Sequence, residues 1–276
     1  RGAHALVAAV LRKRAASSPA ALARTAWRRR ALIAEAPTLR QAVLDFAITS
    51  DAAERDDEDA QDEVLGLRLA DDPRRERAWL GAIAEAARRA MSSSAKLAAL
   101  RRLLRRISQP AIVFTGYRDT LAWLHAALRH AFACEVLHGL QGPAERQRAL
   151  DAFTRGRARV LLATDAAAEG LNLHTSCRAV VLFDLPWTPT RIEQRIGRVD
   201  RLGQARRVHA WLLDDGSAPA AAFSARLDER RAAVGTWTDE LARDPDAAGV
   251  PPPGRPPDAA QEQAACRQLV RARAWR

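Results

Sequence analysis

The sequence predicts an α/β fold in which helices flank a parallel sheet. Between Pro110 and residue 213, five short apolar runs of strand length alternate with windows of helical periodicity. These runs are predominantly apolar, which is typical of strands buried on both faces and joined by right-handed helical crossovers. Alanine inflates the hydrophobic fraction of 48%. The larger apolar residues therefore suffice for one well-packed domain with helical additions.

The first third of the chain, residues 1–91, predicts a helical extension. Alanine, leucine and arginine dominate it, and helix-breaking prolines stand only at Pro19, Pro37 and Pro73. The segment 51–63 is so densely acidic that we interpret it as a solvated linker that divides the extension.

An amphipathic helix is predicted over residues 95–107. Ser94 can cap its start, and Pro110 follows its end. The apolar residues recur at helical spacing and the arginines take the other positions. The apolar stripe consists of Leu97, Leu100, Leu104 and Ile107.

The domain expected over residues 92–213 continues with alternating strands and helices. We expect strands at 111–114, 134–137, 160–163, 179–183 and 208–213. The helices between them are expected at about 119–131, 143–155 and 189–201, with a shorter one near Ala166. Residues 214–276 form the tail. It has a helical window at about 218–243 and then a proline-rich run, 250–257, that is extended or disordered.

The charge balance favours an anionic partner such as nucleic acid. Lysine plus arginine number 44 against 33 acidic residues, which gives a net charge of +11. The alternative is codon bias, because a GC-rich genome produces alanine and arginine in excess. We find no apolar run long enough for a membrane span and no secretory signal. The first residue is Arg1 and not methionine, which is typical of a fragment.

The three cysteines offer neither a disulfide framework nor a metal site. Cys134, Cys177 and Cys266 lie far apart and no CxxC pair occurs. We therefore expect a reducing, cytoplasmic location and no metal bound by this chain.

Polar and turn-forming residues follow the predicted strands, at the edge where parallel sheets bind ligands. They are Thr115-Gly116, His138-Gly139, the stretch from Thr164-Asp165 to Glu169-Gly170, and Asp184. Two of these residues can have a structural role instead of a binding role. Asp165 can cap the short helix after it, and Gly170 can permit a turn. Arg195 is expected to pair with a nearby carboxylate.

The helix expected at 189–201 carries a polar stripe opposite an apolar one. At 100° per residue, Ile192, Ile196 and Val199 lie on one side. The opposite side carries Gln194, Arg198 and Arg201. Two guanidinium groups one turn apart suit a polyphosphate, although an ordinary solvated face is the alternative.

The segments together resemble a known family. The residues that carry the resemblance are Ala111 to Thr115, His138-Gly139, Leu162 to Asp165, Glu169 to Asn172, and the stretch from Asp184 to Gln204. Over residues 92–213, this order resembles the second, C-terminal motor lobe of superfamily-two helicases. It is most similar to Swi/Snf-like DNA translocases of the bacterial HepA/RapA type. The resemblance implies a RecA-like fold for this lobe.

The resemblance also implies roles for individual residues. Arg198 and Arg201 match the arginine fingers that reach the γ-phosphate of ATP, and these are the expected catalytic residues. Four residues match positions that bind the nucleotide or couple it to nucleic acid, namely Gln194, Asp165, Glu169 and Gly170. Thr115 and Thr164 match positions that approach nucleic-acid phosphates.

The sequence contains only part of such a motor's site. No phosphate loop of the form G-x-x-x-x-G-K-S/T occurs, and no Asp-Glu pair follows an apolar strand. We therefore expect ATP and Mg²⁺ to be held mainly by an N-terminal lobe outside this chain, and the chain alone to be inactive. The expected partners are that lobe and nucleic acid, with double-stranded DNA as our first expectation.

Other functions remain open at this stage. One is a noncatalytic module, derived from such a lobe, that binds nucleic acid or protein. Another is the lobe of an RNA helicase, since the motifs of the two branches overlap. A small-molecule α/β enzyme is disfavoured, because no strand is followed by G-x-G-x-x-G or by a nucleophile elbow.

Overall fold

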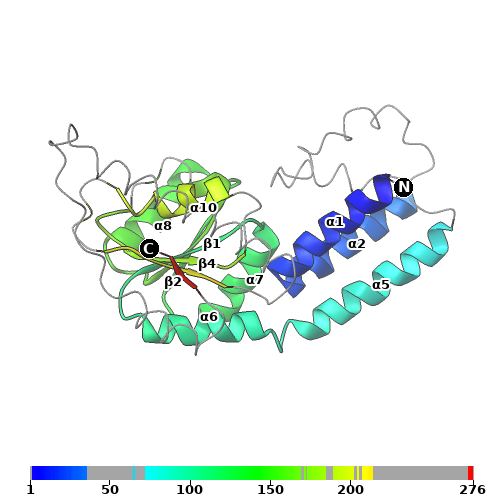
Figure 1. The fold of residues 1–276 in the computed structure, drawn as a ribbon, viewed down its shortest axis with the longest axis horizontal. Helices are drawn as coiled ribbons and strands as arrows, with labels where there is room; N and C mark the ends of the chain where they lie inside the picture. The colour runs from blue at the N-terminus through cyan, green and yellow to red at the C-terminus, as the bar shows by residue number, and fades with distance from the viewer. Residues whose placement is uncertain are drawn as a thin grey trace, which may run out of the picture.

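The structure consists of an α/β lobe and three helices that extend from it (Figure 1). It is a computed structural model and describes residues 2–35, 65, 72–168, 171, 173–184, 189–201, 204, 207–213 and 273–275. The acidic linker at 51–63, the helical window at 218–243 and the proline-rich run at 250–257 lie outside the described residues.

A sheet of order β2-β3-β1-β4-β5-β6 forms the centre of the lobe. Five strands are mutually parallel: β1 (Ala111–Thr115), β2 (Cys134–Leu137), β3 (Val160–Thr164), β4 (Ala179–Leu182) and β5 (His209–Leu212). β1 lies at the middle, because Ala111 is in register with Val160 of β3 on one side and with Ala179 of β4 on the other. This arrangement confirms the predicted class, a parallel sheet flanked by helices.

Helices cover both faces of the sheet, as the predominantly apolar strands predicted. On one face, leucines of α6 (Ala95–Arg106) and α7 (Arg118–Leu128) pack against Val113, Leu162 and Val181. On the other face, α8 (Pro143–Thr154), α9 (Asp165–Ala168) and α10 (Pro189–Ile196) pack against alternate residues of the same strands, such as Phe114 and Leu182. Because successive strand residues point to opposite faces, each strand contributes to both cores.

The extension consists of α1 (Gly2–Ser17), α2 (Pro19–Glu35) and α5 (Pro73–Ala90). α2 packs on α5 through a small core that includes Ala26, Leu80 and Ala84. The buried Arg29 strengthens this contact by donating from Nε to Glu76 Oε1 at 2.7 Å. The helical character predicted for this part of the chain is confirmed in its described residues, and α5 leads directly into α6 (Figure 1).

Two elements differ from the prediction. The helix expected to reach Arg201 ends at Ile196, and a turn follows in which Val199 N donates to Ile196 O at 2.9 Å. A short strand, β6 (Arg273–Trp275), pairs antiparallel with β5, within a tail expected to be helical or disordered. β6 covers the otherwise open edge of β5, which gives this pairing a physical reason.

No described helix combines the length and the apolar character that crossing a membrane requires.

Candidate functional site

The carboxyl ends of β1 and β4 meet at the point where the chain changes direction across the sheet. The connection after β1 leads toward β2, and the connection after β4 leads the opposite way, toward β5. Open parallel sheets bind ligands at such a switch point. Thr115 and Gly116 end β1 here, and Asp184 follows β4.

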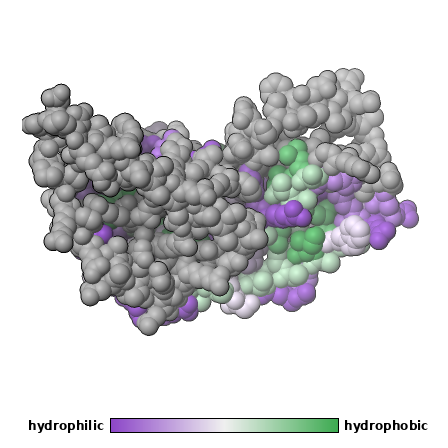
Figure 2. All heavy atoms as spheres, in the orientation of Figure 1, coloured by the Kyte–Doolittle hydropathy of each residue, from purple (hydrophilic) through white to green (hydrophobic). Residues whose placement is uncertain are grey.

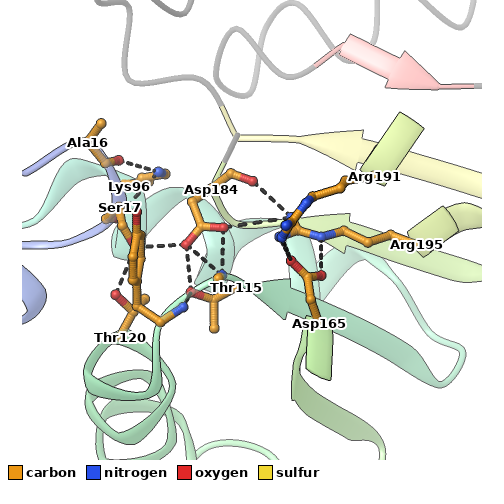
Figure 3. A network of polar contacts seen from close by, with 11 residues as sticks. Ala16, Ser17, Lys96, Thr115, Thr120, Asp165, Asp184, Arg191 and Arg195 are labelled. Atoms are coloured by element: carbon orange, nitrogen blue, oxygen red, sulfur yellow. Dashed lines mark hydrogen bonds and ion pairs between the residues drawn. The ribbon is translucent and has the colours of Figure 1, made fainter. Parts of the chain in front are cut away.

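The carboxylate of Asp184 is the centre of a polar network at this point (Figure 3). It is buried, with 5% exposure. Its Oδ2 accepts hydrogen bonds from Thr115 Oγ1 at 2.6 Å and from Ser17 Oγ at 2.7 Å. Gly116 N donates to Oδ1 at 3.0 Å. These donors compensate for the cost of removing a carboxylate from water.

Thr115, expected to contact nucleic acid, is part of this network. Its side chain has no exposed surface, and its hydroxyl proton is donated to Asp184. Because α1 brings Ser17 to the same carboxylate, the end of β1 is covered by the chain itself. The expected contact of Thr115 with nucleic acid stays a prediction. Thr164, in register with Thr115, is 6% exposed, and its contact with nucleic acid stays a prediction.

Arg195 of α10 joins the ends of β3 and β4. Its Nε and Nη2 donate to the two oxygens of Asp165 at 2.6 and 2.7 Å, and its Nη1 donates to the backbone oxygen of Asp184 at 3.1 Å. This confirms the prediction that Arg195 pairs with a carboxylate. Bidentate geometry suits the planar guanidinium, and three donated bonds offset the cost of burying its charge.

Asp165, predicted to contact the nucleotide, is placed as the partner of α10. Both of its oxygens are bonded to Arg195, and Arg191 Nη1 lies 3.8 Å from Oδ2. Asp165 is also the first residue of α9, directly after β3. The carboxylate therefore joins the end of β3 to α10. This helix directly precedes Arg198 and Arg201, called the motif arginines below.

Of the predicted polar stripe, Gln194 lies on α10, whereas Arg198 and Arg201 lie beyond its last residue, Ile196. Ile192, Ile196 and Val199 are all buried, which confirms the predicted docking stripe. Gln194 and Arg201 are exposed, and Arg198 is half-buried. Among the described residues, the guanidinium groups of Arg198 and Arg201 have neither a hydrogen-bond nor an ion-pair partner.

Two predicted positions, Glu169 and Gly170, lie outside the described residues, so their expected roles stay predictions.

Two residues of this network have no role assigned from the sequence. The sequence identifies Asp184 only as a polar residue after a strand, and that position is the signal that could have pointed to it. Ser17 gave no signal, because it belongs to a different helix and lies 167 residues from its partner. The described residues contain no group of three or more His, Cys, Asp and Glu side chains able to hold a metal ion.

Comparison with known proteins identifies the lobe. Residues 95–203 match the family model of the helicase conserved C-terminal domain. The uncharacterized ATP-dependent helicase YqhH of Bacillus subtilis is 41% identical over 110 residues, which cover 40% of this chain and 19% of that protein. The ATP-dependent RNA helicase DBP5 of Scheffersomyces stipitis is 36% identical over 113 residues, covering 38% and 22% of the two chains. The RNA polymerase-associated protein RapA of Actinobacillus succinogenes is 34% identical over 121 residues, covering 42% and 12%.

The matched region thus spans about a fifth or less of each of these relatives. It includes the strands β1 to β4, the Asp165–Arg195 pair, α10 and the motif arginines after it. The helices α1, α2 and α5 lie outside it. Residues 95–203 therefore form a helicase conserved C-terminal domain, a C-terminal lobe of the superfamily-two type.

Proposed function

We propose that this chain supplies the C-terminal lobe of an ATP-dependent nucleic-acid motor, in which Arg198 and Arg201 stabilise charge on the transferred phosphoryl group. The observation that carries the proposal is the state of α10. Its apolar stripe is buried, while both motif guanidinium groups lack a partner within the described part of the chain. Solvent-accessible guanidinium groups on the segment directly after a docked helix can meet a phosphate on an opposing lobe.

The nucleotide site is completed by an N-terminal lobe in this proposal. That lobe supplies the phosphate loop and the carboxylates that hold Mg²⁺, because this sequence contains neither motif. Bound Mg²⁺ supplies charge neutralisation of the phosphates. On this chain, exposed Gln194 contacts the nucleotide, while Glu169 and Gly170 couple it to nucleic acid. Asp165 acts by holding Arg195.

Double-stranded DNA is the nucleic acid along which the motor is proposed to move. The sequence Asp184-Leu185-Pro186-Trp187 and the ending Leu202-Gly203-Gln204 favour the Swi/Snf-like branch, and RapA is among the relatives. The likeness to DBP5, named an RNA helicase, supports RNA as the second candidate. Stimulation of ATP turnover by duplex DNA, compared with stimulation by RNA, separates the two.

The decisive experiment replaces the two arginines in the complete motor. Arg198→Ala and Arg201→Ala should each lower nucleic-acid-stimulated kcat by about 10³-fold or more, because each removes charge stabilisation made in the transition state. Nucleotide affinity should change much less. The lobe should still fold, because Ile192, Ile196 and Val199 continue to dock α10.

Two controls make the result specific. Arg105→Ala removes an exposed arginine of α6 on the opposite face of the sheet, and it should leave turnover near normal. The 276-residue chain alone should hydrolyse ATP no faster than background. Near-normal ATP turnover in both Arg198→Ala and Arg201→Ala would show that these arginines belong to an ordinary solvated surface.

A further inference from the structure

The bend between α1 and α2 is attached to the lobe by two neighbouring serines. Ser17 and Ser18 are each 1% exposed. Both hydroxyls bond to Thr120 Oγ1 at the start of α7, Ser17 at 2.8 Å and Ser18 at 2.7 Å. Only Ser17 also reaches the Asp184 carboxylate, at 2.7 Å (Figure 3). Lys96 supports the same bend by donating to Ala16 O at 2.8 Å.

The direction of this hydrogen-bond chain follows from counting protons. A carboxylate without a proton only accepts, so Ser17 gives its single hydroxyl proton to Asp184. Thr120 must then donate to Ser17, and Ser18 must donate to Thr120. The hydroxyls thus point in one direction, from Ser18 through Thr120 and Ser17 to Asp184. Chains of this kind polarise each bond along the row.

The chain continues from Asp184 to α10. Arg195 Nη1 donates to the Asp184 backbone oxygen at 3.1 Å and lies 3.7 Å from its Oδ1. The remaining donors of Arg195 hold Asp165. A continuous polar path therefore joins Ser17, outside the helicase C-terminal domain, to α10 inside it, the helix directly before Arg198 and Arg201.

We propose that Ser17 is a positioning residue for α10. The α1–α2 bend thereby helps to fix the position of Arg198 and Arg201, which follow α10. Without the Ser17 donor, Asp184 Oδ2 keeps Thr115 and the more distant Gly116 N. The carboxylate is then free to turn toward Arg195, which divides this guanidinium between Asp184 and Asp165. α10 is held less firmly, and the turn that carries Arg198 loosens with it. The expected effect of Ser17 on ATP turnover rests on the proposed function, whereas its expected effect on the stability of α10 does not.

Backbone hydrogen exchange in the 276-residue chain tests directly whether Ser17 helps to keep α10 in place. The amides of Gly197, Val199 and Asp200 report on the stability of α10, because they donate to carbonyls of α10 at 2.8 to 2.9 Å. Ser17→Ala should speed their exchange by about threefold or more relative to amides of β1 and β3, as expected for local opening.

Ser18→Ala is the matched control. It removes a buried serine hydroxyl from the same bend, including its bond from Ala21 N at 3.0 Å, but it leaves the Ser17 to Asp184 bond in place. Exchange at the three reporter amides should then stay near the wild-type rate. An equal increase in both serine variants, or no increase in Ser17→Ala, overturns the proposal.

A double-mutant cycle checks that Ser17 acts through Asp184. Asp184→Asn removes the negative charge near Arg195 while keeping the side chain's shape. If both residues act on one path, the double variant should exchange no faster at the reporter amides than Asp184→Asn alone. Additive increases would mean that Ser17 acts elsewhere, and the proposal fails.

Turnover by the complete motor tests the consequence. Ser17→Ala should lower kcat with little change in KM, and Ser18→Ala should lower it less. If Arg198→Ala abolishes turnover while Ser17→Ala leaves kcat unchanged, the positioning role is wrong. If Arg198→Ala itself is harmless, the proposed function fails, and the exchange result still decides whether Ser17 helps to keep α10 in place.

Discussion

At the scale of single residues, the lobe relies on two carboxylates and one guanidinium that lie between its core and its surface. Asp184 is almost fully buried, whereas the Asp165 side chain is 25% exposed. Arg195 joins them and is 3% exposed. Burying such charges costs several kcal/mol each unless partners satisfy them, so the value of each residue depends on the others remaining. Loss of one partner should therefore cost more than an ordinary surface ion pair.

Arg195→Ala tests this dependence. It leaves Asp165 without its bidentate donor and the Asp184 oxygen without its Arg195 bond, so we expect about 3 kcal/mol lower unfolding free energy. Arg191→Ala is the control on the same helix. Arg191 lies 3.8 Å from Asp165 with 32% of its side chain exposed, and its removal should cost less than about 1 kcal/mol. Urea unfolding of the 276-residue chain measures both, and equal losses would contradict the assigned role of Arg195.

The Cys177 thiol should make the stability of the lobe pH-dependent in the alkaline range. Burial raises the pKa of this thiol to about 11, from an ordinary value of 9.0. The folded state therefore favours the protonated thiol. Its contribution is fully present below pH 9 and is lost as the pH rises toward 11.

The comparison of wild type with Cys177→Ala isolates this effect. The unfolding free energy of the variant should fall less steeply between pH 9 and pH 11 than that of the wild type. Other groups also titrate in this range, so only the difference between the two proteins is diagnostic. Parallel pH profiles would show that the Cys177 thiol does not contribute.

At the scale of elements, α6 begins as its local sequence predicted. Ser94 Oγ accepts a hydrogen bond from Leu97 N at 3.3 Å, which satisfies one of the free amides of the first turn. The buried face of the helix consists of Leu97, Ala99, Leu100, Leu103 and Leu104. The cap therefore fixes the start of the helix that leads into the central strand β1.

Ser94→Ala should cost about 1 kcal/mol of unfolding free energy, the usual value of a lost N-cap. Ser94→Asp should restore most of it, because a carboxylate also accepts from the Leu97 amide. Ser93→Ala, at an exposed neighbouring position, serves as the control and should be nearly neutral. Chemical denaturation of the three variants gives the comparison. Equal stability of Ser93→Ala and Ser94→Ala would contradict the cap.

At the scale of the whole molecule, the described helices of the extension carry an excess of basic residues. The helices α1, α2 and α5 together contain twelve basic and three acidic residues. Some of these cations are structural, such as the buried Arg14 and Arg29. The exposed face of α5 shows how others are presented, because Arg75 lies 4.7 Å over the ring of Trp79, itself 58% exposed. Over the helical extension, apolar side chains lie together and hydrophilic ones border them (Figure 2).

Such a charge distribution predicts salt-dependent binding of nucleic acid without sequence preference. If about three to five phosphates are contacted, affinity should fall roughly 10²-fold to 10³-fold between 50 and 200 mM salt. Fluorescence anisotropy with labelled duplex DNA and duplex RNA measures the slope for each nucleic acid. Binding that is undetectable at low salt would indicate that the net charge of +11 reflects codon bias alone.

The class of the fold and most of its elements follow from local sequence patterns. The apolar runs predicted all five parallel strands, and helical periodicity predicted α6 and the buried stripe of α10. These signals are local, since each depends on residues within a few positions of one another. The motif order likewise identified the helicase lobe, because residue types and spacing along the chain suffice for it.

The hydrogen-bond partners of the polar residues depend on the tertiary structure. Thr115 is a hydrogen-bond donor to Asp184 and not an exposed contact, because Ser17 and the end of β4 lie against it. α10 ends at Ile196, directly before Gly197, although the apolar stripe continues to Val199, and β6 pairs with β5 over a long separation. Hydrogen bonds between residues as far apart as Ser17 and Asp184 follow no local period, so their partners are set by the packing of distant elements.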